Sequence, residues 1–210
     1  MEDVLEVYAR PRHPRRPLVC FDETNKEQHR EVVAPLPVVA GHPARDESTY
    51  ERTGVSNIFM CVAPLDNWRH VKVTDHRKAV DWAQCRQELV DVHFPDVECI
   101  VVVLDNLNTH TPAALYAAFP PAEAKRSWDR LEFHYTPKQG SWLNMAEIEL
   151  SVLGRQCLDR RLPDQDTLRS ETVAWATRRN TAQATIDWQF TSAEARVKLK
   201  KLYPVLKPAD

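Results

Sequence analysis

Cys99-Ile-Val-Val-Val-Leu-Asp105 is the most strongly strand-forming stretch of this 210-residue chain. Its central residues are all apolar and mostly β-branched, and such an unbroken run is typical of a strand buried on both faces of a sheet. The run ends abruptly at an aspartate. We therefore expect an α/β fold with this strand at the centre of a sheet that is flanked by helices.

A second apolar run, Pro17-Leu-Val-Cys-Phe-Asp22, also ends in an aspartate and is too short for a helix. Between the two runs, residues 78–93 repeat apolar side chains at helical spacing, at Trp82, Cys85, Leu89 and Val92. This pattern predicts a crossover helix that makes the two strands parallel neighbours. Because parallel strands end at the same edge of a sheet, Asp22 and Asp105 should lie side by side there.

The remaining elements follow from hydrophobic period and turn chemistry. Thr111, followed by Pro112, is expected to cap a helix, which leaves Asp105 without a capping role. Residues 34–54 are polar and carry prolines, so we expect a loop there. The other expected elements are strands at 29–33, 57–63, 68–73 and 131–135, and helices at 111–119, 142–158, 166–179 and 192–203, the last with a Thr191–Glu194 capping box.

The length of the chain suits one compact domain. We expect residues 1–16 to form a basic arm, residues 17–163 the core, and residues 164–210 a helical segment packed on that core. No apolar run approaches the roughly 20 residues that a membrane span requires, and the start lacks the features of a signal peptide, so we expect a cytoplasmic protein. The five scattered cysteines predict reduced, mostly buried thiols rather than disulfides or a zinc ribbon.

Composition and motifs exclude several kinds of site. The net charge of −2 argues, taken alone, against nucleic-acid binding, although basic residues gather near both ends of the chain. The four glycines are isolated, so no phosphate-binding glycine loop exists. Ser141 lacks the exposed turn of a nucleophilic serine, and the histidines lack the spacing of a helical metal site.

A third acidic residue, Glu147, lies in Ser141-Trp-Leu-Asn-Met-Ala-Glu147-Ile-Glu-Leu. An apolar helix face passes through Leu143 and Ala146, and Glu147 borders it. Glu149 is about 200° further around the helix and should point to solvent. A glutamate at the edge of a buried face is costly unless it is paired, protonated or bound to a metal.

Three carboxylates that converge from two strand ends and a helix repel one another, and a divalent cation compensates for that repulsion. Carboxylate oxygens are the ligands that Mg²⁺ or Mn²⁺ prefers. Two such ions, roughly 3.5–4 Å apart, can clamp the attacking and leaving oxygens of a phosphoryl transfer. Asp22, Asp105 and Glu147 therefore predict a site for two Mg²⁺ or Mn²⁺ ions that acts on phosphodiesters.

Three blocks of sequence resemble those of bacterial insertion-sequence transposases of the mariner superfamily. The blocks are Cys20-Phe-Asp22-Glu-Thr, Val103-Leu-Asp105-Asn-Leu-Asn-Thr-His110 and Tyr135-Thr-Pro-Lys-Gln-Gly-Ser-Trp-Leu-Asn-Met-Ala-Glu147. The resemblance implies an RNase H-like fold in which Asp22, Asp105 and Glu147 form a metal-binding DDE triad. It also implies hydrolysis of DNA at transposon ends, strand transfer to target DNA, a homodimer in the active assembly, and a bacterial cytoplasmic protein that joins the nucleoid when bound to DNA.

The interval between Asp105 and Glu147 is longer than in many mariner relatives, with the proline-rich residues 119–122 as the place for the extra length. Glu149 is therefore the alternative third acid. We also expect no helix-turn-helix DNA-binding module in this chain. A truncated, non-catalytic fragment that binds DNA or oligomerises, and a structure-specific nuclease of the same fold, are the alternative functions.

Four further residues could serve the site. Asn106 could orient a metal-bound water or make turn contacts. His110 could support the metal site, contact DNA phosphate or lie on the surface. Lys138 could contact phosphate, and Trp142 could stack on a base, although a core position is favoured for Trp142.

Overall fold

The computed structural model describes residues 1–33, 40, 49–106 and 110–203, and its five strands form one mixed sheet in the order β3-β2-β1-β4-β5. Strands β1, β2 and β3 pair antiparallel, while β4 pairs parallel with β1 on one side and β5 on the other. The strands are β1 Leu18–Glu31, β2 Tyr50–Ala63, β3 Trp68–Thr74, β4 Ile100–Leu104 and β5 Leu131–Tyr135.

The neighbouring strands β1 and β4 bring the two predicted aspartates to one edge of the sheet. Their register pairs Cys20 with Val103, so Asp22 and Asp105 stand at the same distance beyond that pair. All residues of β4 are buried, as expected, although the strand in the middle of the sheet is β1. The prediction of parallel, adjacent strands is confirmed.

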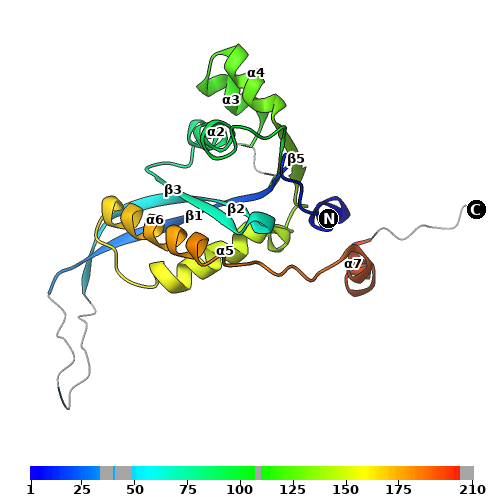
Figure 1. Ribbon diagram of the computed structural model, residues 1–210. Helices are drawn as coiled ribbons and strands as arrows, with labels where there is room; N and C mark the ends of the chain where they lie inside the picture. The colour runs from blue at the N-terminus through cyan, green and yellow to red at the C-terminus, as the bar shows by residue number, and fades with distance from the viewer. Residues whose placement is uncertain (34–39, 41–48, 107–109, 204–210) are drawn as a thin grey trace, which may run out of the picture.

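Strand β1 continues past Asp22 and forms a long hairpin with β2, which projects from the rest of the molecule at the lower left of Figure 1. The strands expected at 17–22 and 29–33 are therefore one strand. Between these two segments, buried and exposed residues alternate only weakly, because little of the protein covers the projecting hairpin. Strand β2 begins inside the expected loop 34–54, and residues 34–39 and 41–48 of that loop lie outside the described residues.

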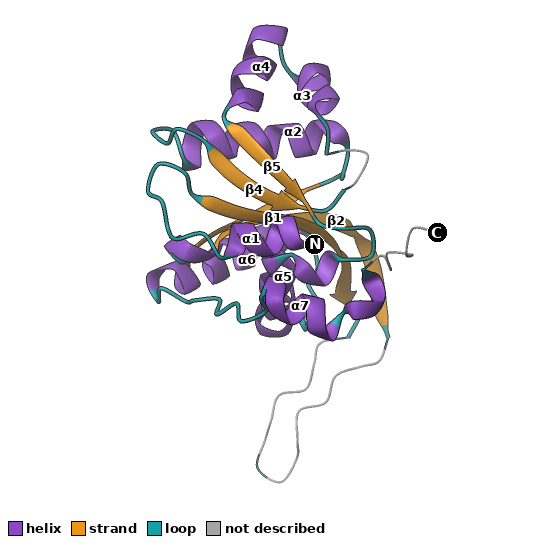
Figure 2. Cartoon of the chain, turned by 90° about the vertical axis from the view of Figure 1, so that its right-hand side faces the viewer, coloured by secondary structure: helices purple, strands orange, loops and turns teal. Residues whose placement is uncertain are grey.

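Helices cover both faces of the sheet (Figures 1 and 2). Side chains alternate along β1, so Leu18 and Cys20 join the core on one face, while Val19 and Phe21 join the core on the other. The first face carries α1 Glu2–Tyr8, α5 Met145–Leu153 and α6 Gln165–Thr181, and the second carries α2 Ala79–Glu88, α3 Pro112–Ala118 and α4 Pro121–Asp129.

The fold begins near the start of the chain. Helix α1 buries Val4 and Val7 completely in the core. The expectation of a basic arm over residues 1–16 is therefore wrong for residues 2–8, whereas residues 9–17 form neither helix nor strand, as expected. A helix this short is stabilised by packing rather than by its own sequence, so its period gave little signal.

Three helical details differ from the expectations. No helix was expected over residues 121–129, whereas Pro121 opens α4 there. Val92 is 67% exposed because α2 passes into a π-helix, Leu89–His93, whose wider turn shifts the phase of the apolar face. Thr111 occupies the cap position of α3, but its side chain makes no capping hydrogen bond.

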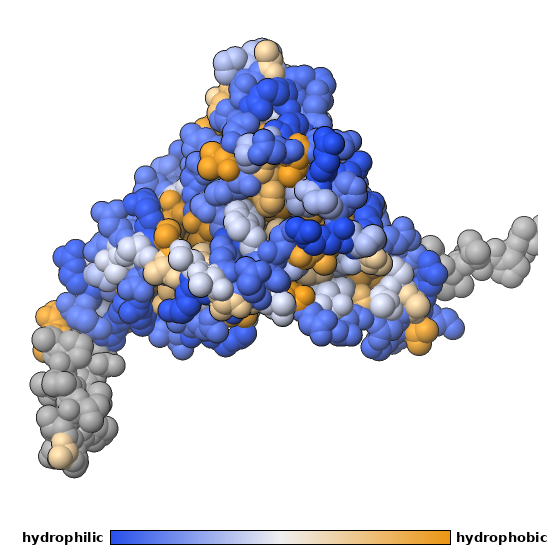
Figure 3. Space-filling view, viewed as in Figure 1, coloured by the Kyte–Doolittle hydropathy of each residue, from blue (hydrophilic) through white to orange (hydrophobic). Residues whose placement is uncertain are grey.

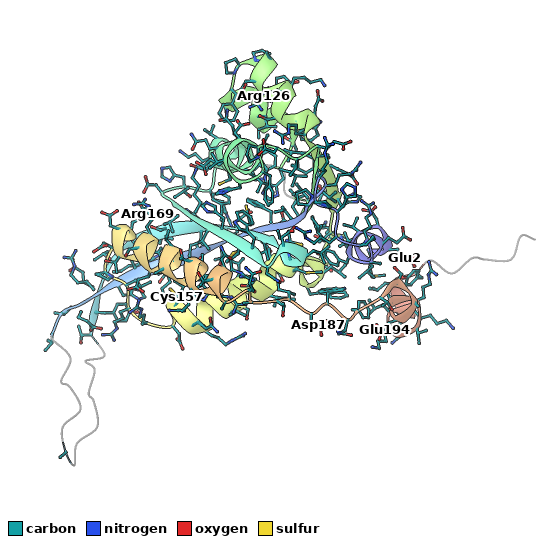
Figure 4. All side chains as sticks on the ribbon, viewed as in Figure 1. Glu2, Arg126, Cys157, Arg169, Asp187 and Glu194 are labelled. Carbon is teal, nitrogen blue, oxygen red and sulfur yellow. The ribbon has the colours of Figure 1, made fainter. Side chains whose placement is uncertain are left out.

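The end of the described chain packs against its beginning. Helix α7 Ser192–Lys198 has the expected capping box of Thr191 and Glu194, and a 3₁₀ turn, Lys200–Leu202, follows it. Arg196 of α7 forms an ion pair with Glu2 at 2.6 Å, and Figure 4 shows Glu2 and Glu194 on neighbouring helices. The ends of the described chain therefore form part of one structure.

The surface in Figure 3 is mostly hydrophilic, with scattered apolar side chains. None of the helices in the described part of the chain is both long and apolar enough to cross a membrane. All five cysteines are free thiols, and four of them are buried, as the sequence predicts.

Candidate active site

Asp22 lies on β1 with 8% of its surface exposed. Its carboxylate accepts a hydrogen bond from the backbone N–H of Glu23 at 2.8 Å, and this contact lowers its pKa. Burial has the larger effect, and together with the negative charges of Glu147 and Asp105 it raises the pKa of Asp22 to about 7. The structure therefore brings the three predicted acids into one electrostatic environment.

Asn144 connects Asp22 to the helix that carries Glu147. Its buried Nδ2 donates to the Phe21 carbonyl at 2.7 Å and, at 3.4 Å, to Asp22 Oδ2. Its Oδ1 accepts from the backbone N–H of Ala146 and caps α5. Sequence analysis missed this residue, whose signal is an asparagine directly before a helical apolar pattern.

Glu147 stands in the first turn of α5 and shares a cavity of about 710 Å³ with Asp22. Strand β1 supplies one wall of this cavity through residues 22–26, and α5 supplies the other. Among the described residues, no donor contacts the Glu147 carboxylate. Glu147 is thus free to bind a cation or substrate.

Glu149 does not point to solvent, and this prediction was wrong. It is 1% exposed, and its carboxylate accepts two hydrogen bonds from Arg179, at 2.7 and 3.0 Å. The buried guanidinium of Arg69 lies 3.2 Å from the same carboxylate. The side of α5 opposite Glu147 therefore packs against α6 and β3, and ion pairing removes Glu149 as a candidate third acid.

Asp105 follows the last residue of β4, and its partly exposed side chain lines another cavity, of about 350 Å³. Asn106 and Lys138, both predicted to serve the site, line the same cavity. Lys138 belongs to the turn after β5, in which Gln139 adopts a left-handed backbone conformation. One cavity therefore adjoins Asp22 and Glu147, and another adjoins Asp105.

His110 is buried and lies between two carboxylates. Its Nδ1 is 2.8 Å from Asp105 Oδ1, and its Nε2 is 3.4 Å from Glu23 Oε2. Burial lowers the pKa of His110, but the contacts with Asp105 and Glu23 outweigh burial and raise it. The surface position that sequence analysis left open is excluded, and His110 is in direct contact with a predicted metal ligand.

Glu23, Asp105 and His110 bring potential metal-binding atoms within 4.8 Å of one another. The two carboxylates approach different nitrogens of the imidazole ring, however, and one ion can bind only one of those nitrogens. Both contacts favour a protonated ring, and the hydrogen bond of Nδ1 is made with the backbone carbonyl of Asp105, at 3.3 Å. Below them, Arg86 is completely buried over the Phe21 ring, 3.5 Å from its centroid, and burial lowers its pKa.

Asp22, Asp105 and Glu147 offer only carboxylate oxygens, which is the donor type that Mg²⁺ and Mn²⁺ select. Burial, and after it the neighbouring charges of Glu147 and Asp105, raise the pKa of Asp22, so a negative charge on Asp22 is penalised here. A bound divalent cation would reverse that penalty. The residues present therefore fit such an ion.

Trp142 is 45% exposed, so the favoured core position was wrong. It lies in the 3₁₀ turn Ser141–Leu143 just before α5, and its ring contacts the edge of Phe190. Ser141 of the same turn lines the cavity of Asp105. The exposed indole therefore belongs to the residue that follows Ser141 of that cavity.

Comparisons with known proteins agree with this geometry. Residues 17–169 match the family profile described as DDE superfamily endonuclease. No curated protein sequence matches the chain.

Two solved structures show the same fold. The Mos1 mariner paired end complex with Mn has a TM-score of 0.55 and 15% identity over 86% of this chain and 54% of that chain. The Mos1 strand transfer complex has a TM-score of 0.55 and 16% identity over 86% of this chain and 55% of that chain. The chain therefore spans about half the length of those relatives, and the likeness confirms the expected RNase H-like α/β fold.

Proposed function

The chain belongs to the DDE superfamily of endonucleases, and from this membership we propose that it is the catalytic domain of a DNA transposase. The proposed reaction is metal-dependent hydrolysis of phosphodiesters at transposon ends, followed by strand transfer to target DNA. One observation carries the proposal: Asp22 and Glu147 line one cavity from different elements, and the charges of Glu147 and Asp105 add to burial in raising the pKa of Asp22. Separate structural roles for the three acids would not require such convergence.

We assign Asp22, Asp105 and Glu147 as the ligands of two Mg²⁺ or Mn²⁺ ions. Bound at this site, the ions would activate the attacking oxygen and stabilise the leaving oxygen. Asn144 and the Glu23 N–H hold the Asp22 carboxylate, and His110 holds that of Asp105. Asn106 and Lys138 are assigned to the substrate from their position in the cavity beside Asp105.

The proposal is tested with supercoiled plasmid DNA and with labelled transposon-end duplexes. In Mg²⁺ or Mn²⁺ the protein should nick DNA, and Asp105→Asn should abolish nicking while the protein remains folded by circular dichroism. A folded wild-type protein that never nicks either substrate would contradict catalysis. Nicking without joined products, in the presence of both ends and target, would indicate a structure-specific nuclease instead of a transposase.

We further propose that the active assembly is a homodimer and that it acts on DNA in the bacterial cytoplasm, at the nucleoid. The similar Mos1 structure is a paired end complex, which supports a dimer with one site for each end. Sedimentation of the protein with and without end DNA tests it, since a dimer should form at least in the DNA-bound state.

A further inference from the structure

The cavity that holds Asp22 and Glu147 extends well beyond them, along α5 and the following π-helix, Gly154–Leu158. A second cavity, of about 290 Å³, shares Arg155 and Asp159 with it and continues to Arg178 on α6. The two cavities adjoin at these shared residues and are together called the α5 groove here. It leads from the acidic residues toward α6.

Four cations line the α5 groove; Arg160 forms an ion pair with Glu171 at 2.6 Å, and the other three have no acidic partner among the described residues. Lys26 donates to the Leu158 carbonyl at 2.7 Å, and Arg155 donates to the Ser151 hydroxyl at 2.7 Å. Within the described part of the chain, no carboxylate forms an ion pair with Lys26, Arg155 or Arg178. Unpaired positive charge along a concave surface attracts an extended polyanion.

Gly154 lines the same groove, and protein packing does not explain it. Its φ of −50° and ψ of −56° are ordinary helical values. A Cβ atom at this position would meet no atom within 4 Å. Glycine destabilises a helix relative to alanine, so the missing side chain fits a position where a ligand backbone approaches the helix closely.

We propose that one DNA strand lies in the α5 groove, with its backbone passing over Gly154 and its phosphates bound by Lys26, Arg155 and Arg178. This inference rests on the proposed function and adds the path of the substrate. The groove is acidic at Glu147 and basic at Arg178. Phosphate should therefore bind at the Arg178 end without divalent ions, whereas binding at the acidic end requires them.

Charge reversal tests the path. Fluorescence anisotropy measures binding of a labelled DNA strand to the intact chain, in Ca²⁺ and in EDTA. Arg155→Glu and Arg178→Glu should each weaken binding about tenfold or more, because each replaces an attraction by a repulsion. The control variant is Lys125→Glu on α4. Figure 4 shows that its neighbour Arg126 lies far from Cys157, which belongs to the π-helix of the groove. The control variant should bind DNA like the wild type.

Replacement of Gly154 tests whether the DNA backbone approaches the helix closely at this residue. Gly154→Ala should raise the melting temperature by about 2–4 °C, since alanine favours the helix and meets no obstacle. The same variant should bind DNA at least about threefold more weakly, which is ~0.7 kcal/mol. Gly154→Leu should bind more weakly still. Stability and affinity should therefore change in opposite directions, which a purely structural glycine would not produce.

The outcomes separate this inference from the proposed function. If the wild-type protein nicks DNA but Arg155→Glu, Arg178→Glu and Gly154→Ala all bind normally, the groove is not the path and the proposed function stands. A loss of affinity in Lys125→Glu equal to that in Arg155→Glu would also overturn the path, because binding would then follow net charge alone. A wild-type protein that neither binds nor nicks DNA overturns both.

Discussion

Glu149 and Arg179 form a two-pronged ion pair that joins α5 to α6, with Arg69 of β3 beside the same carboxylate. Two residues away on the same helix, Glu147 lines the cavity of Asp22. No hydrogen-bond donor among the described residues contacts its carboxylate. One helix thus carries a structural glutamate and a candidate catalytic one. The two roles lead to opposite expectations for matched substitutions.

Glu149→Gln should destabilise the protein by about 3–5 kcal/mol, because it leaves the buried guanidinium of Arg69 and the partly buried guanidinium of Arg179 without their counter-charge. Glu147→Gln should leave the free energy of unfolding nearly unchanged and abolish metal-dependent nicking. Urea denaturation followed by circular dichroism measures the first effect, and plasmid nicking the second. A stable Glu149→Gln protein without activity, beside an active Glu147→Gln protein, would reverse the assignment.

Asp22→Asn should stabilise the metal-free protein at pH 8 by about 1–2 kcal/mol. The pKa of Asp22 is raised to about 7 in the folded state, so the folded protein binds this proton more tightly than the unfolded chain. The wild type therefore loses stability as the pH rises from about 4 to about 7. Denaturation in EDTA should show the variant's advantage at pH 8 and little of it at pH 4, where Asp22 of the folded protein is protonated and carries no buried charge. An equal difference at both pH values would contradict this account.

Metal binding should depend on pH for the same reason. A cation must displace the proton from Asp22, so it should stabilise the protein more above pH 7 than below it. We expect Mn²⁺ to raise the melting temperature at pH 8 and to have a smaller effect at pH 6. Asp22→Asn and Asp105→Asn should lose most of the response at pH 8. A response that survives in both variants would place the ion elsewhere.

Local sequence was enough to predict that Asp22 and Asp105 lie at the same edge of the sheet, because each residue ends an apolar run and parallel strands share an edge. It could not predict the environment of Glu149, whose partners Arg69 and Arg179 are remote in sequence and meet it only through tertiary packing. A helical period also implies a single buried face, whereas α5 packs against the sheet and α6 at once.

Tertiary packing also decides the environment of two other residues near the site, and the sequence could not predict it. His110 was recognised as a candidate, but its position between two carboxylates depends on Glu23, which points to the opposite face of β1 from Asp22. Trp142 is apolar and near a helix start, which favoured burial, yet no described element covers it fully. Whether a single aromatic side chain is exposed depends on which elements pack against it in the folded protein, and this cannot be read from the local sequence.

His110 should act as a positioning residue for Asp105. Its ring lies between the carboxylates of Asp105 and Glu23 and against the indole of Trp82, so it fixes the direction of the Asp105 carboxylate. His110→Ala should weaken Mn²⁺ binding or nicking by about tenfold to a hundredfold, the usual effect of losing a partner of a metal ligand.

A merely structural role predicts a different result. Removing a buried ring also lowers stability, so Mn²⁺ affinity is measured by electron paramagnetic resonance well below the melting temperature of each variant. His110→Gln, which keeps a donor toward Asp105, should recover part of the affinity that His110→Ala loses, even if both melt at the same temperature. Equal affinity in the wild type and His110→Ala, with only the melting temperature lowered, would show that the ring fills space and does not position Asp105.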